Sequence, residues 1–356
     1  MTGIAVLTGL PIVISVSQYF LTSINGMSTT NRIYFNEIDI VKGIAMLTVI
    51  WHHSMIVYPI NLQALPWCMH AMAINHTYCL IVFFLVSGYL FAFSSNSSFA
   101  HTLNSKVKRL LIPYLCFEGI NMAVKMMAPA LVNTKVDSLG SYLSKMVLYG
   151  GELWFVYTLF IIFLIWPIFL QRMKRPQAVY IVLALAMLDH FLPTNLLGGM
   201  LMLHEVVYYS IWFVIGWLIR DMNRELLGRR DYLMIISVLF VCLCVVFVQR
   251  VRLPFVDAYV KGAIGCGFVW MIAFQMAKFH WLARPLGFVG KYSLSYYWLN
   301  GFALVPARYV VVNVLRVEPT PAIAICIWCI CVLLITMAVL VIRRIPVIRT
   351  AIGVVS

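Results

Sequence analysis

The residues best suited to chemistry in this largely apolar sequence lie between positions 39 and 53. Asp39, Lys42 and His53 are carried by the stretch Asp-Ile-Val-Lys-Gly-Ile-Ala-Met-Leu-Thr-Val-Ile-Trp-His-His. A helix advances about 100° and 1.5 Å per residue, so Lys42 and His53 share a face to within roughly 20° and lie roughly 16 Å apart along the axis. Asp39 lies one turn from Lys42 on that face, where the two side chains can pair. His52 points roughly 80° away from Lys42, so His53 is the better aligned histidine.

A charged stripe on an apolar helix has two interpretations. It is either a structural polar cluster between packed helices, or the lining of a cavity or catalytic site. Ionisable residues inside a membrane are costly and are usually kept for a function, which favours the second interpretation. The same reasoning applies to Glu118 and Asn121, which fall well within a later apolar run and therefore need a partner or a cavity.

The composition indicates a membrane protein. Of the 356 residues 63% are hydrophobic and only 11% are charged, and the mean hydropathy is +0.94, far above that of soluble proteins. The formal net charge of +14 would suggest nucleic acid in a soluble protein, but here the positive-inside rule explains it, so no nucleic-acid partner is expected. The nine cysteines have no metal-ligand spacing with histidine, and neither a bound metal nor a bound cofactor is expected.

Apolar runs of about 20 residues, each long enough to cross a bilayer as a helix, recur along the chain. We place them near residues 39–58, 70–94, 108–128, 152–171, 177–192, 203–220, 231–249, 254–278, 290–312 and 321–342. The expected fold is all-α, a polytopic membrane bundle of about ten transmembrane helices. Lysine and arginine are concentrated in alternate loops, which predicts that those loops and the C-terminus face the cytoplasm.

Residues 1–26 are expected to form a separate element. The run from Gly3 to Ile24 is uncharged, is long enough to span a bilayer, and has no basic residue before it, unlike a signal peptide. It is either an extra peripheral helix or an upstream start that is not used in the cell, with Met27 opening a polar N-terminus. We expect residues 1–26 to be an optional hydrophobic helix without catalytic groups, and residues 27–356 to form the membrane domain.

The stretch around Lys42 resembles the first membrane helix of the acyltransferase-3 family of integral membrane O-acyltransferases. In that family a basic residue, usually arginine, is followed after ten residues by a histidine, and Lys42 and His53 match this pattern. Four further segments are similar to family motifs in the same order along the chain, namely Phe83–Tyr89, Lys106–Pro113, Leu153–Phe155 and Gly290–Tyr297. Many members have histidine where this chain has Asn300. The Asp-Ile-Val-Lys-Gly-Ile form is most similar to the fucose 4-O-acetylase-like branch.

The resemblance implies transfer of an acyl group, most often acetyl, from a cytoplasmic acyl-CoA to a sugar hydroxyl of an extracytoplasmic polysaccharide or glycolipid at the bacterial inner membrane. His53 would be the general base on that hydroxyl, or would carry the acyl group covalently. Lys42 would hold donor phosphate or stabilise developing negative charge, and Asp39 would orient Lys42. Lys108 and Arg109 would bind donor phosphates, although basic residues at a helix start are equally typical of positive-inside anchors.

The expected binding residues for the acceptor are Glu152, Trp154, Tyr297 and Asn300. Aromatic rings can stack on a sugar, but membrane-interface belts and core packing explain most aromatic residues of such a chain. A transporter or flippase for a lipid-linked sugar would also be basic and carry intramembrane charges. A polysaccharide polymerase would share the compartment and the acceptor, but the longest expected external loop, roughly residues 127–151, is short for that class.

Overall fold

The computed structural model describes residues 36–56, 62, 65–94, 98–127, 138–193, 196–221, 229–248, 257–317 and 321–345. Within these ranges every regular element is helical and none is a strand, which confirms the predicted all-α class. Residues 1–26 lie outside the described residues, so their expected role as an optional helix stays a prediction.

Most predicted spans coincide with a helix. The helices are α2 (Asn36–Ser54), α3 (Pro66–His76), α4 (Ile81–Phe93), α5 (Phe99–Lys106), α6 (Ile112–Met127), α7 (Leu139–Tyr149), α8 (Trp154–Leu170), α9 (Arg175–Phe191), α10 (Leu203–Leu218), α12 (Arg230–Val248), α13 (Asp257–Met276), α14 (His280–Lys291), α15 (Ser293–Tyr309) and α16 (Pro321–Ile342). The π-helical turn η2 (Val107–Leu111) joins α5 to α6, and a second one, η5 (Val310–Val314), extends α15. The 3-10 segments η3 (Leu196–Met202) and η4 (Ile219–Asp221) flank α10. Three helices were not predicted: α5, α7, which lies in the expected external loop, and α14.

Five helices in the described part of the chain are long and apolar enough to cross a membrane, namely Pro66–Phe93, Phe99–Met127, Gly199–Leu218, Ala258–Met276 and Pro321–Ile342. The pair α7 and α8, bent by 44°, makes a sixth if it is counted as one broken span. The expected count of about ten spans therefore stays a prediction. Fewer helices reach full spanning length than the expected count partly because α8, α9 and α15 have only 17 residues each, which is short for a full bilayer crossing.

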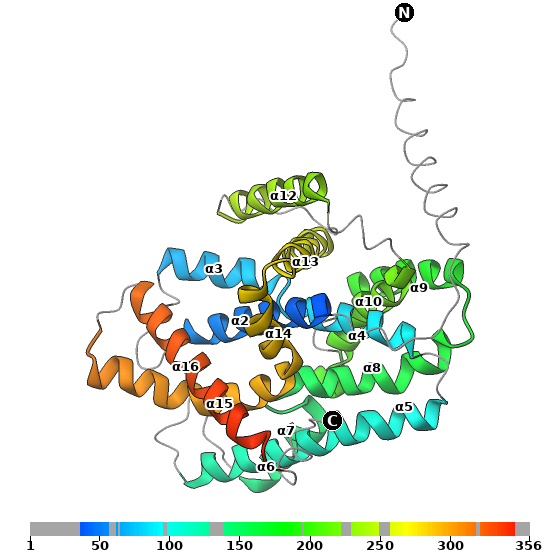
Figure 1. The fold of residues 1–356 in the computed structure, drawn as a ribbon. Coiled ribbons are helices and arrows are strands. Elements are labelled where there is room, and N and C mark those ends of the chain that lie inside the picture. The colour runs from blue at the N-terminus through cyan, green and yellow to red at the C-terminus, as the bar shows by residue number, and fades with distance from the viewer. Residues whose placement is uncertain are drawn as a thin grey trace, which may run out of the picture.

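Helix α2 lies in the middle of the bundle, where it contacts α3, α4, α13, α14, α15 and α16 (Figure 1). It crosses α14 at two glycines. A Cβ on Gly43 would clash with the backbone carbonyl of Leu286, and a Cβ on Gly290 would clash with the backbone carbonyl of Asp39. Small residues of this kind allow the backbones of two membrane helices to touch.

Helices α4 and α10 are joined in the same way. A Cβ on Gly88 would clash with the backbone carbonyl of Phe213, and a Cβ on Gly216 would clash with that of Leu85. Gly88 belongs to one of the sequence motifs described above, as do the glycines that join α2 to α14. Part of what those motifs specify is therefore close helix packing, which sets the positions of the chemically active residues beside them.

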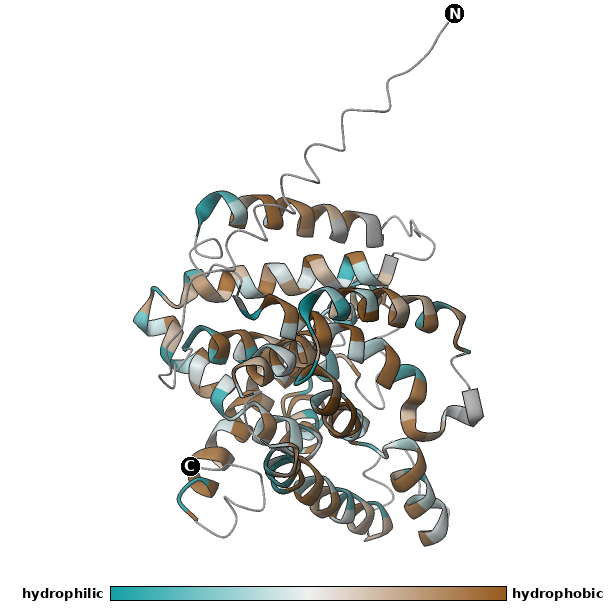
Figure 2. Cartoon of the chain, turned by 90° about the vertical axis from the view of Figure 1, so that its right-hand side faces the viewer, coloured by the Kyte–Doolittle hydropathy of each residue, from teal (hydrophilic) through white to brown (hydrophobic). Residues whose placement is uncertain are grey.

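The outward faces of the bundle are apolar. The ribbon is predominantly hydrophobic along its helices (Figure 2), and large apolar side chains are exposed, for example Leu183 and Met187 on α9 and Leu333 and Met337 on α16. Extended apolar surface of this kind is a liability in water but is suited to contact with lipid tails. The protein is therefore a membrane protein.

Candidate functional site

The predicted ion pair is present on α2. Asp39 Oδ1 lies 2.7 Å from Lys42 Nζ, which confirms the inference from their spacing. Lys42, Met46, Val49 and His53 follow one another at intervals of four, three and four residues, so they form one stripe along the helix. Lys42 lines one cavity and His53 lines another, each with a volume of about 610 Å³. We call them the basic cavity and the histidine cavity.

The basic cavity lies between α2, α4, α5, η2, α8 and the start of α15. Its basic lining residues are Lys42, His101, Lys106, Arg109 and Lys291. Its hydroxyl-bearing lining residues are Ser87, Ser94, Thr102, Ser105, Ser293 and Tyr297. No Asp or Glu of the described residues lines it. A lining of this kind favours an anion, and phosphate in particular, because lysine and arginine donate charge-assisted hydrogen bonds to phosphate oxygens.

Two of these cations lie beside an irregular turn. The π-helical turn η2 begins directly after Lys106 and contains Arg109. Pro113 has no N–H to donate to the carbonyl four residues earlier, which is that of Arg109, so the regular α-helical pattern is interrupted here. Lys106 Nζ lies 3.9 Å from the ring centroid of Phe163, another lining residue. Lys108 is exposed and lines neither cavity, so its expected part in donor binding stays a prediction.

The histidine cavity lies between α2, α3, α6, α8 and α15. Its polar lining includes His52, His53, His76, Asn121, Lys125 and Arg308, together with all four expected acceptor-binding residues, Glu152, Trp154, Tyr297 and Asn300. Tyr297 lines both cavities. The buried Asn300 accepts a hydrogen bond at its Oδ1 from Cys331 Sγ at 3.7 Å. Among the described residues, no group of three or more His, Cys, Asp and Glu side chains is arranged to hold a metal ion.

His76 was not among the residues expected from the sequence. The side chain of Asn75 donates a hydrogen bond from Nδ2 to the carbonyl of Thr48 at 2.6 Å, and this bond ties α3 to α2. The rings of His76 and His52 consequently lie side by side, with centroids 6.0 Å apart. His52 and His53 both line the cavity, so it is their alignment with Lys42, and not the lining, that favours His53. The sequence signal for His76 was a polar Asn-His pair in an otherwise apolar span.

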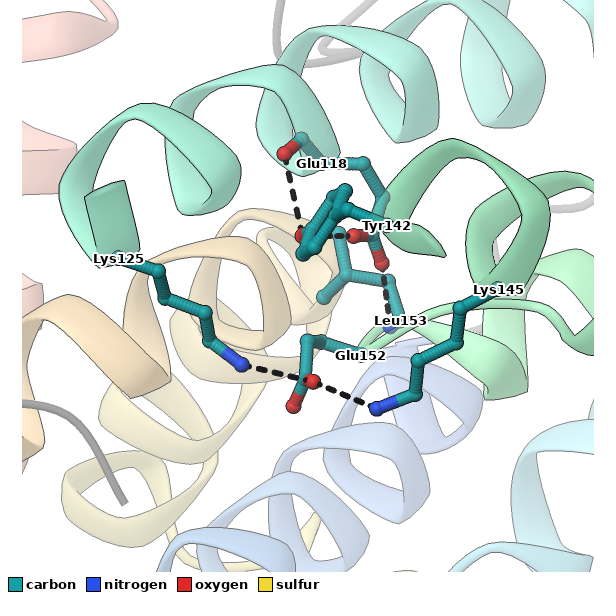
Figure 3. A network of polar contacts seen from close by, with 6 residues as sticks. All are labelled: Glu118, Lys125, Tyr142, Lys145, Glu152 and Leu153. Atoms are coloured by element: carbon teal, nitrogen blue, oxygen red, sulfur yellow. Dashed lines mark hydrogen bonds and ion pairs between the residues drawn. The ribbon is translucent and has the colours of Figure 1, made fainter. Parts of the chain in front are cut away.

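The predicted need of Glu118 for a partner is met by the turn that separates α7 from α8. Glu118, fully buried on α6, accepts a hydrogen bond at Oε2 from the Tyr142 hydroxyl at 2.6 Å (Figure 3). Its Oε1 accepts one from the backbone N–H of Leu153 at 2.8 Å. Gly151 has a φ of +59°, and a Cβ at this position would press on the Glu118 carboxylate. Glu118 therefore holds in place the turn that leads into Trp154.

Glu152, in that same turn, is held by two lysines. Its Oε1 lies 2.8 Å from Lys125 Nζ of α6 and 3.1 Å from Lys145 Nζ of α7 (Figure 3). The two ion pairs tie both helices to the start of α8. Lys125 and Glu152 both line the histidine cavity, so a carboxylate oriented by two ammonium groups is presented to it. A carboxylate in this position is a strong acceptor for hydroxyl donors.

The fold and the site define a class of protein: a helical membrane protein in which a basic cavity and a histidine-lined cavity meet along one central helix. The family model for the acyltransferase domain matches residues 35–342 of the chain. The protein therefore belongs to the acyltransferase-3 family and is a membrane acyltransferase, as expected from its motifs. Searches of curated proteins and of solved structures each returned no match.

Proposed function

We propose that this protein is an O-acetyltransferase of the bacterial inner membrane, of the fucose 4-O-acetylase-like kind. It moves an acetyl group from cytoplasmic acetyl-CoA to a sugar hydroxyl of an extracytoplasmic polysaccharide or glycolipid. One observation carries the proposal: Lys42 and His53 lie on one stripe of α2 but line cavities of different chemistry. A donor and an acceptor of different charge can therefore meet along this helix while their charged and polar groups bind to different residues.

The basic cavity is assigned to the donor. Coenzyme A carries several phosphate groups, and Lys106, Arg109 and Lys291 supply the cations that would bind them. Lys42 belongs to this set, since it lies roughly 16 Å along the helix axis from His53, which is too far to act on the same atom. We therefore assign Lys42 to donor phosphate rather than to charge that develops at the reacting carbonyl, with Asp39 orienting its ammonium group.

The histidine cavity is assigned to the acceptor. Glu152 would accept hydrogen bonds from sugar hydroxyls, Trp154 would stack on the ring, and Asn300 would offer an amide. His53 removes the proton of the attacking hydroxyl as its oxygen bonds to the thioester carbonyl carbon. The carbon–sulfur bond then breaks and the proton ends on the sulfur of coenzyme A. A route through an acyl-histidine uses the same residue and differs only in one covalent intermediate.

The charge distribution supports an orientation in which the basic cavity faces the cytoplasm. The segment that lines the basic cavity contains Lys106, Lys108 and Arg109, and Arg343 and Arg344 follow α16. By the positive-inside rule, such clusters face the cytoplasm, where acetyl-CoA is available. The histidine cavity would then open toward the side on which the glycan acceptor is found, and the C-terminus would be cytoplasmic.

The proposal is tested with purified protein in proteoliposomes, acetyl-CoA labelled in the acetyl group, and candidate bacterial glycans. The expected result is glycan-dependent release of the coenzyme A thiol together with ester-linked label on the glycan. The same preparation supplied with labelled glycan and no acetyl-CoA tests the rival function. Movement of glycan across the bilayer without acylation would indicate a flippase and contradict the proposal.

A further inference from the structure

The basic cavity and the histidine cavity are separated by four side chains that line both. They are Val49 of α2, Leu80 in the turn between α3 and α4, Phe155 of α8 and Tyr297 of α15. Three of the four are purely apolar, and the fourth has one hydroxyl. We call this set the partition. Each cavity combines apolar with polar lining residues, and the partition is the apolar boundary between the cations of the basic cavity and the histidines of the other.

The partition has a defined position on the stripe of α2. Val49 is seven residues after Lys42 and four residues before His53, that is about 10 Å and about 6 Å along the helix axis. A donor held by cations around Lys42 and an acceptor hydroxyl beside His53 must therefore approach one another at Val49. Only the thioester end of the donor, which carries the acyl group, has to reach the partition.

Val49 and Phe155 are the closely packed members of the partition, whereas Leu80 and Tyr297 are half-buried. Val49 and Phe155 are 4% and 5% exposed. The Phe155 ring centroid lies 5.3 Å from that of Tyr297 and 5.0 Å from that of Phe84, and both ring pairs are inclined rather than stacked. In close-packed interiors even one additional methylene has to displace neighbouring atoms. A longer acyl chain at Val49 and Phe155 would therefore have to displace these side chains.

We propose that Val49, Leu80, Phe155 and Tyr297 are the specificity-determining residues for the acyl group, and that they restrict the donor to short-chain acyl thioesters, with acetyl preferred. The inference rests on the proposed function. It names the partition as the feature that selects among acyl-CoA donors of different chain length. The reaction is unchanged by this selection: the acyl carbon exchanges its bond to the thiol sulfur for a bond to the sugar oxygen, and the hydroxyl proton passes to the thiol.

The test compares kcat/KM for acetyl-, propionyl-, butyryl- and hexanoyl-CoA in proteoliposomes, with coenzyme A thiol release as the readout. For the wild-type protein we expect kcat/KM to fall about ten-fold or more with each added methylene, as in other tight apolar pockets. Val49→Ala should raise the ratio of butyryl to acetyl turnover about ten-fold. Leu80→Ala lies in a different element and should change this ratio in the same direction, so the test does not depend on the folding of one variant.

The matched control is Val41→Ala. Val41 is also a buried valine of α2, but it lines neither cavity. Its substitution removes the same two methyl groups, and the ratio of butyryl to acetyl turnover should stay within about two-fold of the wild-type value. Because the ratio is taken within one preparation, a lower yield of any variant does not affect it.

The inference alone would be overturned by wild-type protein that uses butyryl-CoA as well as acetyl-CoA, or by wild-type ratios in both Val49→Ala and Leu80→Ala. An equal shift in Val41→Ala would also overturn it, because general loosening of α2 would then explain the effect. Absence of turnover with every thioester in the wild-type protein would instead overturn the proposed function, and the inference with it.

Discussion

Lys42 and His53 lie on the same stripe of α2, yet Lys42 lines only the basic cavity and His53 only the histidine cavity. Val49, between them, lines both. If the cavities hold donor and acceptor as proposed, substitutions at the two ends of the stripe should affect different kinetic constants. A substitution that removes an interaction made equally in the ground state and the transition state raises KM. A substitution that removes a group acting only in the transition state lowers kcat.

His53→Ala should lower kcat by about 10²- to 10⁴-fold, the usual contribution of a general base, while the protein still accumulates in the membrane. His52→Ala is the internal comparison, since His52 lines the same cavity but lies off the stripe, and its effect should be much smaller. Thiol release and size-exclusion profiles in detergent are measured for both variants. Equal losses of kcat in the two variants would contradict the assignment of His53 as the general base.

Lys42→Met should raise KM for acetyl-CoA by about ten-fold, because a charge-assisted bond to phosphate is lost. Lys42→Arg should keep most of the affinity, since arginine is also cationic and binds phosphate. Initial rates over a range of acetyl-CoA concentrations separate the two constants. A fall in kcat without a change in KM would show that Lys42 acts at the reacting carbonyl instead.

Lys106→Gln and Arg109→Gln should each raise KM for acetyl-CoA by about ten-fold and make the remaining affinity less sensitive to salt. Lys108→Gln is the matched control, because it removes the same charge from the same segment but lies outside the basic cavity. All three variants change the charge of this segment equally, so an effect on membrane topology would appear in each of them. A larger change in KM for Lys108→Gln than for Arg109→Gln would contradict the cavity assignment.

Glu118→Gln should raise KM for the acceptor glycan while KM for acetyl-CoA stays close to the wild-type value. The carboxylate fixes the turn that presents Glu152 and Trp154, and an amide cannot accept hydrogen bonds at both of its terminal atoms. Each charge-assisted bond lost also costs about 1.5–3 kcal/mol of stability, so the thermal midpoint should fall. Tyr142→Phe removes one of these bonds and should give the smaller change of midpoint. Unaltered acceptor kinetics in a folded Glu118→Gln protein would limit Glu118 to a purely structural role.

Gly43→Ala should destabilise the bundle by about 1–3 kcal/mol, because its methyl group would force α2 away from α14. Gly119→Ala is the comparison: a Cβ there meets nothing within 4 Å, so the helix should be unchanged or stabilised by up to about 1 kcal/mol. Thermal unfolding in detergent measures both. Similar midpoints for the two variants would show that the crossing of α2 and α14 tolerates a wider separation.

Much of the local structure follows from the sequence alone. The apolar runs predicted most helices within a few residues, because the length and hydropathy of a run are local properties. The pairing of Asp39 with Lys42 was also predictable, since helix geometry alone places residues three apart on one face. The motifs identified the family, and the need of the buried Glu118 for a partner followed from the cost of an unpaired charge in an apolar span.

The tertiary structure decided which residues from different helices share a cavity. His76 joins His52 and His53 because Asn75 ties α3 to α2, and Lys291 joins Lys106 because α14 packs against α2 through glycine contacts. Helical spacing specifies the face on which a side chain lies, but the neighbours of that face depend on where two helices cross. That crossing is set by contacts between residues far apart in the chain, such as Gly43 with Leu286; the motifs supply the glycines but do not specify which helices these bring together.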